Sequence, residues 1–198
     1  MVKKYNFNTE FKAVVIGGSA GSFQGIIRIL SHIPKDFALP VIIVMHRLKH
    51  VRHGFAEVIS QKSNLQIVEP EDKDAIRKGI VYLAPANYHL SVELGNYFSL
   101  STEEMLNSSR PSIDITLSSA AYIYRNKLVG ILLSGANRDG GMGMKSIKDK
   151  GGLTIVQHPA ECMINTMPKA ALALTAIDYM LKIEQIIELI DELHQYNK

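Results

Sequence analysis

The chain has 198 residues, of which 46% are hydrophobic and 21% charged, and its formal net charge at pH 7 is +3. This length and apolar content suffice for one globular domain with a buried core. No apolar stretch approaches the ~20 residues of a membrane-spanning helix and no basic-then-apolar leader opens the chain, so we expect a cytoplasmic protein without membrane insertion. The basic residues are dispersed, which disfavours nucleic acid as a partner, and the lone Cys162 excludes an internal disulfide.

After a polar segment over residues 1–10, apolar runs of strand length alternate with segments of helical periodicity. We expect strands over residues 12–17, 39–46, 65–68, 79–84, 128–134, 152–157 and 177–180. We expect helices over residues 22–32, 51–62, 112–126, 141–150, 167–175 and 183–196. This alternation is typical of βαβ units, so it predicts an α/β fold with a doubly wound, mainly parallel sheet and helices on both faces.

One region interrupts the parallel order. Segments 88–94 and 97–100 flank Gly95-Asn96, a two-residue link that is typical of a β-hairpin turn. Residues 101–111 are polar and are expected to form a long loop of the kind that lines a binding surface. The helix over residues 183–196 has an apolar stripe and acidic residues on the other side, which favours packing on the domain. Without a repeat or linker, we expect one domain over residues 1–198.

The first expected strand runs into Gly17-Gly18-Ser19-Ala20-Gly21, a G-x-S-x-G pattern between a strand and a helix. Glycine tolerates the backbone angles of a sharp strand-to-helix turn, and a serine on such a turn presents its hydroxyl as a nucleophile. The same pattern also fits a serine that caps the helix in an ordinary βα loop. The pentapeptide alone therefore leaves both interpretations open.

Polar side chains follow three of the expected strands. Ser19 follows the first strand, His46 ends the second, and Asp139 comes shortly after the strand over residues 128–134. The carboxyl ends of parallel strands meet at one edge of a sheet, where ligands bind. A serine nucleophile needs a base, and that base needs a carboxylate that fixes its tautomer. We therefore predict a Ser19–His46–Asp139 triad.

Each of these residues also has a purely structural explanation. His46 could bond to backbone at a strand end, and Asp139 could cap the helix that follows Gly140. His158, at the end of the strand over residues 152–157, is the second candidate for the base. No histidine pair has the spacing of an H-E-x-x-H metal site, so we expect no metal.

The glycine-rich turn over residues 134–143 can direct backbone N–H groups at a developing oxyanion. The same turn fits a phosphate, which keeps nucleotide binding open as an alternative. Against that alternative, the first turn lacks the G-x-G-x-x-G pattern, and the second strand ends in His46 where a dinucleotide-binding protein has an acid. We therefore expect no cofactor.

Six segments carry a more specific signal when they are taken together: Gly17–Ser22, Met45-His46, Tyr82–Pro85 with His89, Arg110–Asp114, Gly130–Gly140 and Met167–Ala170. In this order they resemble the catalytic domain of the CheB-type chemotaxis protein-glutamate methylesterases. The resemblance implies a doubly wound α/β domain that hydrolyses glutamyl methyl esters on cytoplasmic chemoreceptor helices and deamidates particular glutamines there. It also implies that Ser19, His46 and Asp139 are the catalytic residues.

The chain departs from the family pattern at three positions. Relatives usually have threonine where Ala20 stands, proline where Leu48 stands and methionine where Ala136 stands. A backbone N–H is independent of the side chain, so we expect Ala20 and Ala136 at the oxyanion and Arg110 at the substrate. Further basic residues in nearby loops could complement an acidic receptor helix, and these are Arg47, Lys49 and Arg52.

Family members generally carry an N-terminal receiver domain, and only a short segment precedes the first expected strand here, so we expect none. The substrate is then either a methylated chemoreceptor helix or another methylated signalling protein. The alternative is a catalytically impaired module of the same fold that binds such helices or a signalling partner. The departures from the family pattern at Ala20 and Ala136 suggest this alternative.

Overall fold

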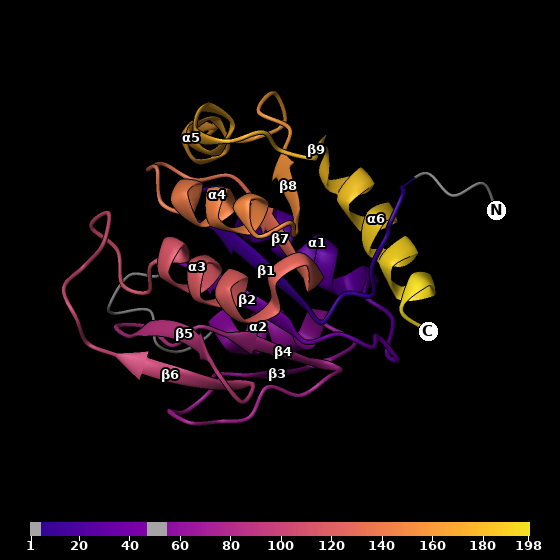
Figure 1. Ribbon diagram of the computed structural model, residues 1–198, viewed down its shortest axis with the longest axis horizontal. Helices are drawn as coiled ribbons and strands as arrows, with labels where there is room; N and C mark the ends of the chain where they lie inside the picture. The colour runs from indigo at the N-terminus through magenta and orange to yellow at the C-terminus, as the bar shows by residue number, and fades with distance from the viewer. Residues whose placement is uncertain (1–4, 47–54) are drawn as a thin grey trace.

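The structure, a computed structural model, describes residues 5–46 and 55–198. In this part of the chain, seven parallel strands form one sheet in the order β3-β4-β2-β1-β7-β8-β9 (Figure 1). The strands are β1 (Ala13–Gly18), β2 (Val41–Met45), β3 (Gln66–Val68), β4 (Ile80–Leu83), β7 (Leu128–Leu132), β8 (Leu153–Gln157) and β9 (Tyr179–Leu181). All seven expected strands are present, and the predicted mainly parallel sheet is confirmed.

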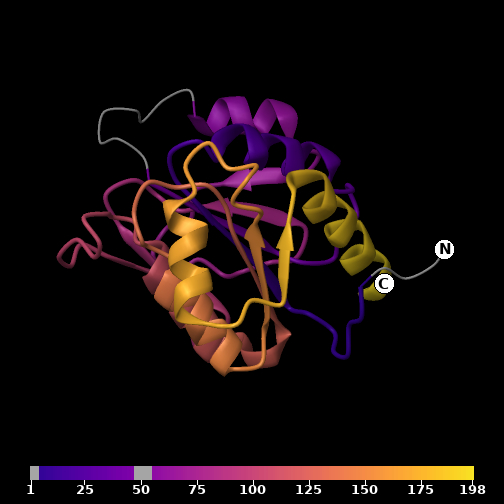
Figure 2. The same cartoon turned by 90° about the horizontal axis from the view of Figure 1, so that it is seen from above.

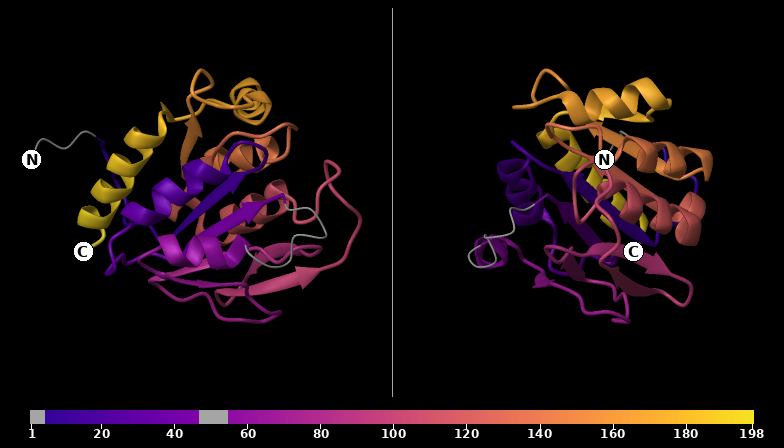
Figure 3. Two further views of the ribbon diagram at one scale, coloured as in Figure 1. Left: turned by 180° about the vertical axis from the view of Figure 1, so that it is seen from behind. Right: turned by 90° about the vertical axis from the view of Figure 1, so that its left-hand side faces the viewer.

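Helices cover both faces of the sheet, as predicted. Helices α1, α2 and α6 lie on one face and α3, α4 and α5 on the other (Figure 2), and the first group is in front in the left panel of Figure 3. They are α1 (Phe23–His32), α2 (Phe55–Lys62), α3 (Ile113–Tyr124), α4 (Gly141–Asp149), α5 (Thr166–Leu174) and α6 (Ile183–Tyr196), with a 3-10 turn η1 (Arg125–Lys127) after α3. Residues 51–54, expected at the start of α2, lie outside the described residues.

The central strand β1 is buried along its whole length because both faces of the sheet are covered. Side chains of a strand alternate between the two faces. Val14 and Ile16 accordingly pack in one hydrophobic core with α1 and α6, whereas Ala13 and Val15 pack in a second core with α3 and α4. The end of β1 is therefore held rigidly between two layers of helices.

The predicted hairpin is confirmed as a separate two-stranded sheet, β5 (His89–Glu93) and β6 (Tyr97–Ser101). The paired strands end at Glu93 and Tyr97, so the link has three residues instead of the expected two, and Gly95 and Asn96 in it both have positive φ. The hairpin packs against α3, where the Thr116 hydroxyl donates to the Leu90 carbonyl at 2.7 Å. This contact holds the loop after β6 close to the start of α3.

The two ends of the described chain pack together. Residues 5–10, expected as a polar segment, form no helix or strand, but Tyr5 is buried and its hydroxyl donates to the Gln185 carbonyl of α6 at 3.1 Å. The apolar stripe of α6 is buried, as predicted. Among the described residues no helix is both long and apolar enough to cross a bilayer. Cys162, on the loop before α5, is half-buried, and burial raises the pKa of its thiol to about 11.

Helices α3 and α4 approach each other closely at Gly143. A Cβ atom at Gly143 would lie 2.5 Å from the Leu117 Cβ, so Gly143→Ala forces the two helices apart. We expect the free energy of unfolding to fall by about 1–3 kcal/mol, as overpacking costs more than alanine gains in a helix. Urea titration measures this. In the control Gly25→Ala the new atom meets only the side chain of Ile183, whose terminal methyl lies 2.9 Å away, and we expect a much smaller change.

Candidate active site

The ends of β2, β1 and β7 lie side by side at the carboxyl edge of the sheet. The backbone N–H of Ser19 donates to the Ser134 carbonyl at 2.9 Å, and the N–H of His46 donates to the Gly18 carbonyl at 3.4 Å. Strand pairing thus continues one residue past each strand and places Ser19 between the loops of His46 and Asp139. All three residues therefore lie at the sheet edge where the sequence placed them.

A tight turn leads from β1 into α1. Gly21 has φ +83°, a left-handed conformation that favours glycine, and a Cβ there would also lie 2.6 Å from the Met163 Cβ. Ser22 is the N-cap of α1, and its hydroxyl donates to the Ser19 carbonyl at 2.7 Å. Ser19 is thus not the helix cap, and its partly exposed side chain belongs to the turn itself.

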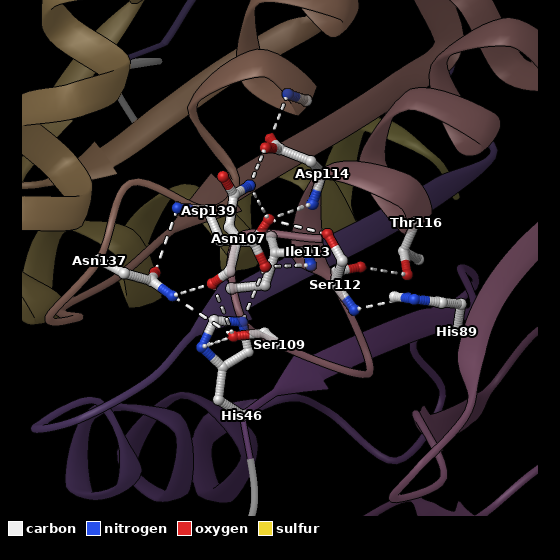
Figure 4. A network of polar contacts seen from close by, with 11 residues as sticks. His46, His89, Asn107, Ser109, Ser112, Ile113, Asp114, Thr116, Asn137 and Asp139 are labelled. Atoms are coloured by element: carbon white, nitrogen blue, oxygen red, sulfur yellow. Dashed lines mark hydrogen bonds and ion pairs between the residues drawn. The ribbon is translucent and has the colours of Figure 1, made fainter. Parts of the chain in front are cut away.

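His46 and Asp139 form a direct pair. The imidazole Nε2 lies 2.8 Å from Oδ2 of Asp139, whose side chain is fully buried, whereas that of His46 is 14% exposed (Figure 4). A carboxylate at this distance fixes which imidazole nitrogen carries the proton and holds the plane of the ring. Two of the three predicted catalytic residues are therefore in contact.

Asp139 accepts hydrogen bonds from five groups, two of which are the first backbone N–H groups of α3 (Figure 4). The donors are His46 Nε2 at 2.8 Å, Ile113 N at 2.7 Å, Ser112 Oγ at 2.8 Å, Asn107 Nδ2 at 3.1 Å and Asp114 N at 3.1 Å. Burial alone would raise the pKa of Asp139, but the bonds from His46, Ile113, Ser112 and Asn107 outweigh it and lower the pKa to about 2. The carboxylate is therefore ionised at neutral pH.

The alternative explanation, that Asp139 caps the helix that follows it, is wrong, although Asp139 does cap another helix. Gly140, with φ +88°, is the N-cap of α4, the helix that follows Asp139 in the chain. Asp139 instead caps α3, which precedes it, and the hydroxyl of the α3 N-cap, Ser112, donates to it. Capping α3 and orienting His46 are thus performed by one carboxylate.

The other imidazole nitrogen, Nδ1 of His46, lies 3.2 Å from Oγ of Ser109 (Figure 4). Within residues 5–46 and 55–198, no hydrogen bond joins the Ser19 hydroxyl to this imidazole. Ser109 comes from the loop after β6, which the sequence indicated as a binding surface without singling out this hydroxyl. The structure therefore brings a serine to His46 that sequence reasoning missed.

A second buried carboxylate, Asp114, lies beside Asp139. Its Oδ2 accepts from Asn107 Nδ2 at 2.9 Å, and its Oδ1 accepts from the N–H of Gly143 at 2.7 Å. Burial raises the pKa of Asp114 to about 6, the Gly143 bond opposes this, and the charge of Asp139 adds to it. The Asn107 amide therefore bridges two carboxylates. The only signal in the sequence was the polar loop that contains Asn107.

The other predicted residues lie as follows. The backbone N–H groups of Ala20 and Ala136 make no hydrogen bond within the described part of the chain, so both are free to face a ligand. Arg110 donates from Nη1 to the carbonyls of Thr102 and Glu103 at 2.6 and 2.8 Å, which ties it to its own loop. Residues 47–54, which include Arg47, Lys49 and Arg52, lie outside the described residues.

His158, the second candidate for the base, does not contact Asp139. Its Nδ1 accepts from the N–H of Ala160 at 3.2 Å, within its own loop. Across the described residues, no three His, Cys, Asp or Glu side chains are grouped so as to hold a metal ion. The arrangement that the structure offers for chemistry is thus His46 with Asp139 and nearby hydroxyls.

Comparisons with known proteins show which family this chain resembles. Residues 14–190 match the family model of the CheB methylesterases. A Leptospira interrogans protein, provisionally named as a protein-glutamate methylesterase/protein-glutamine glutaminase, is 42% identical over 95% of this chain and 97% of its own length. A Thermotoga maritima protein with that name is 33% identical, and the chain spans 54% of it. The crystal structure of the Thermotoga maritima CheB methylesterase catalytic domain superposes with a TM-score of 0.88 at 32% identity, covering 93% of this chain and all of that one.

Replacement of the buried carboxylate tests its structural role. Asp139→Asn puts an amide N–H₂ among five donors, so we expect the free energy of unfolding at pH 7 to fall by about 2 kcal/mol. Because the folded pKa of Asp139 lies below the unfolded value, its stabilisation is complete above pH ~4. The difference between variant and wild type should therefore shrink as the pH falls from about 4 to about 2 in urea titrations. A difference that is constant with pH would contradict this role.

Proposed function

The chain belongs to the CheB methylesterase family, and on that premise we propose that it hydrolyses methyl esters of glutamate side chains. In this proposal Ser19 is the nucleophile, His46 is the base and Asp139 orients the imidazole. One observation carries the proposal: His46 Nε2 lies 2.8 Å from a buried, ionised carboxylate at the sheet edge where Ser19 follows β1. Deamidation of glutamine at the same site is part of the proposal, because an amide and an ester both react through a tetrahedral intermediate and give the same acyl-enzyme.

The first half of the reaction forms an acyl-enzyme. Asp139 occupies Nε2 of His46, so Nδ1 is the nitrogen that takes the proton from Ser19 as its oxygen attacks the γ-carbonyl carbon. Nδ1 has one lone pair, so the Ser109 hydroxyl beside it first turns its hydrogen to the Asn107 carbonyl. The negative charge that develops on the carbonyl oxygen faces the free N–H groups of Ala20 and Ala136, and such donors are typically worth about 10²–10³ in turnover. The imidazolium then protonates the leaving methoxide, and methanol departs.

The second half repeats these steps with water. His46 removes a proton from water as the water oxygen attacks the acyl carbon, and it returns a proton to Ser19 when the ester bond breaks. The products are a glutamate carboxylate and the free enzyme. With glutamine as substrate the leaving group is ammonia, and the final product is the same. The bonds of Asp139 to α3 remain in place throughout, so the base is reset without rearrangement.

We propose that the substrate is a methylated cytoplasmic helix of a chemoreceptor or another methylated signalling protein. The family membership supports this substrate class. Arg110 contributes at the substrate side by holding the loop over residues 102–110, in which Asn107 and Ser109 contact Asp139 and His46. Unlike the Thermotoga maritima relative, the Leptospira interrogans relative has nearly the length of this chain.

A binding module of the same fold without catalysis is the second candidate. The observation in its favour is that Nδ1 of His46 contacts Ser109, while no hydrogen bond from Ser19 reaches the imidazole within the described residues. A binder has no activated hydroxyl, whereas a hydrolase turns over ester. Turnover therefore separates the two candidates.

Ser19→Ala should lower ester turnover by about 10³- to 10⁶-fold while the unfolding midpoint stays near that of wild type, since removal of a nucleophile has this effect elsewhere. Release of methanol from a methyl-esterified glutamyl peptide measures the rate. Ser31→Ala, an exposed serine on α1, is the matched control and should leave the rate unchanged. Equal turnover by wild type and Ser19→Ala would exclude Ser19 as the nucleophile.

The substrate class has its own test. In mass spectrometry, a chemoreceptor helix peptide with methyl-esterified glutamate should lose the mass of one CH₂ per site, about 14 Da. A peptide with glutamine at the same site should gain about 1 Da. We expect both changes with wild type and neither change with Ser19→Ala. Hydrolysis of a small ester with no reaction of the methylated helix would place the substrate outside this class.

A further inference from the structure

The Ser109 hydroxyl has three polar neighbours. Its oxygen lies 3.2 Å from His46 Nδ1, accepts from Asn137 Nδ2 at 3.3 Å, and lies 3.4 Å from the Asn107 carbonyl (Figure 4). Ser109 is 9% exposed, so water competes little for these contacts. The hydroxyl is thus enclosed on the side of His46 that faces away from Asp139.

The contact with Asp139 determines what Ser109 does. The Asp139 carboxylate accepts a hydrogen bond from Nε2–H, so Nδ1 of the neutral imidazole has no proton and the Ser109 hydroxyl donates to it. Before Nδ1 takes the proton of Ser19, the Ser109 hydrogen turns to the Asn107 carbonyl and frees the nitrogen lone pair. Once Nδ1 is protonated, the Ser109 oxygen accepts from Nδ1–H. Ser109 therefore has a hydrogen bond for either protonation state of His46.

A strained turn holds this hydroxyl in place. Leu106 and Ser109 form an isolated bridge, with the Ser109 N–H donating to the Leu106 carbonyl at 3.0 Å, and the two residues between them have φ of +52° and +60°. Left-handed backbone is costly for residues other than glycine and persists where the surroundings enforce it. Here the Asn107 amide bonds both Asp139 and Asp114, and Asn137 bonds the Asn107 carbonyl at 3.2 Å.

We propose that Ser109 is a positioning residue for the hydrolysis. Its oxygen stays against Nδ1 of His46, as a donor before proton transfer and as an acceptor after it, while Asp139 holds the ring at Nε2. A ring held at one nitrogen can pivot about that contact, whereas a ring held at both nitrogens has one orientation toward the substrate. This role rests on the proposed function. Nucleophilic attack remains with Ser19.

The kinetic test compares variants within one turn. Ser109→Ala should lower kcat about tenfold and leave KM unchanged, since the Ser109 oxygen accepts from Nδ1–H only when His46 is charged, and one such hydrogen bond corresponds to roughly that factor. Ser108→Ala is the control, because Ser108 is exposed, and should match wild type. Ser109→Thr and Ser109→Val have nearly the same shape and differ in the hydroxyl, so kcat of the threonine variant should exceed that of the valine variant even if the added methyl group perturbs both.

A spectroscopic readout follows the contact independently of turnover. In protein with ¹⁵N-labelled histidine, the Nδ1 resonance of His46, assigned by its loss in His46→Gln, should move in Ser109→Ala and stay in place in Ser108→Ala. Equal kcat for Ser109→Ala and Ser108→Ala, a rise in kcat, or an unmoved resonance would overturn the role of Ser109. Wild-type protein without ester turnover would overturn the proposed function and this role with it.

Discussion

The organisation of the site depends on one buried carboxylate at the start of one helix. Asp139 lies where the first N–H groups of α3 point, and these groups would otherwise be buried without acceptors. The helix end favours a negative charge, and three side chains add further bonds. The cost of burying the charge is thereby outweighed. Because the carboxylate is fixed by the backbone of α3, the imidazole that it holds is fixed relative to the whole layer of helices.

The fold supplies what this carboxylate needs. Strand β1 lies between β2 and β7, so residues 19, 46 and 134 continue the same ladder of backbone bonds beyond the sheet. The close approach of α3 and α4 at Gly143 keeps the end of α3 beside the turn that contains Asp139. Asp114 joins the two helices through Gly143 and contacts Asp139 through Asn107. Catalytic geometry and helix packing therefore depend on the same few bonds.

The sequence sufficed for the elements and for the edge of the site. Periodicity located every strand and helix of the described chain to within a few residues, and the rule that parallel strands end at one edge placed Ser19, His46 and Asp139 together. The sequence did not predict which helix Asp139 caps. Local capping rules favour the helix that follows a residue in the chain, whereas α3 precedes Asp139. The contacts of Ser109 and Asn107 depend on how a long loop folds against distant residues, and no periodicity reports that. The packing of Tyr5 on α6 was not predictable either, because Tyr5 and Gln185 lie far apart in the sequence.

The most direct measurement of the central claim is a crystal structure of the protein after reaction with a phosphonate ester that mimics the tetrahedral intermediate of glutamyl ester hydrolysis. The account predicts phosphorus bonded to Ser19 Oγ, a phosphonyl oxygen within hydrogen-bond reach of the N–H groups of Ala20 and Ala136, and His46 still bonded to Asp139 through Nε2. An adduct on Ser109, or an unmodified protein in which His46 has turned away from Asp139, would contradict it.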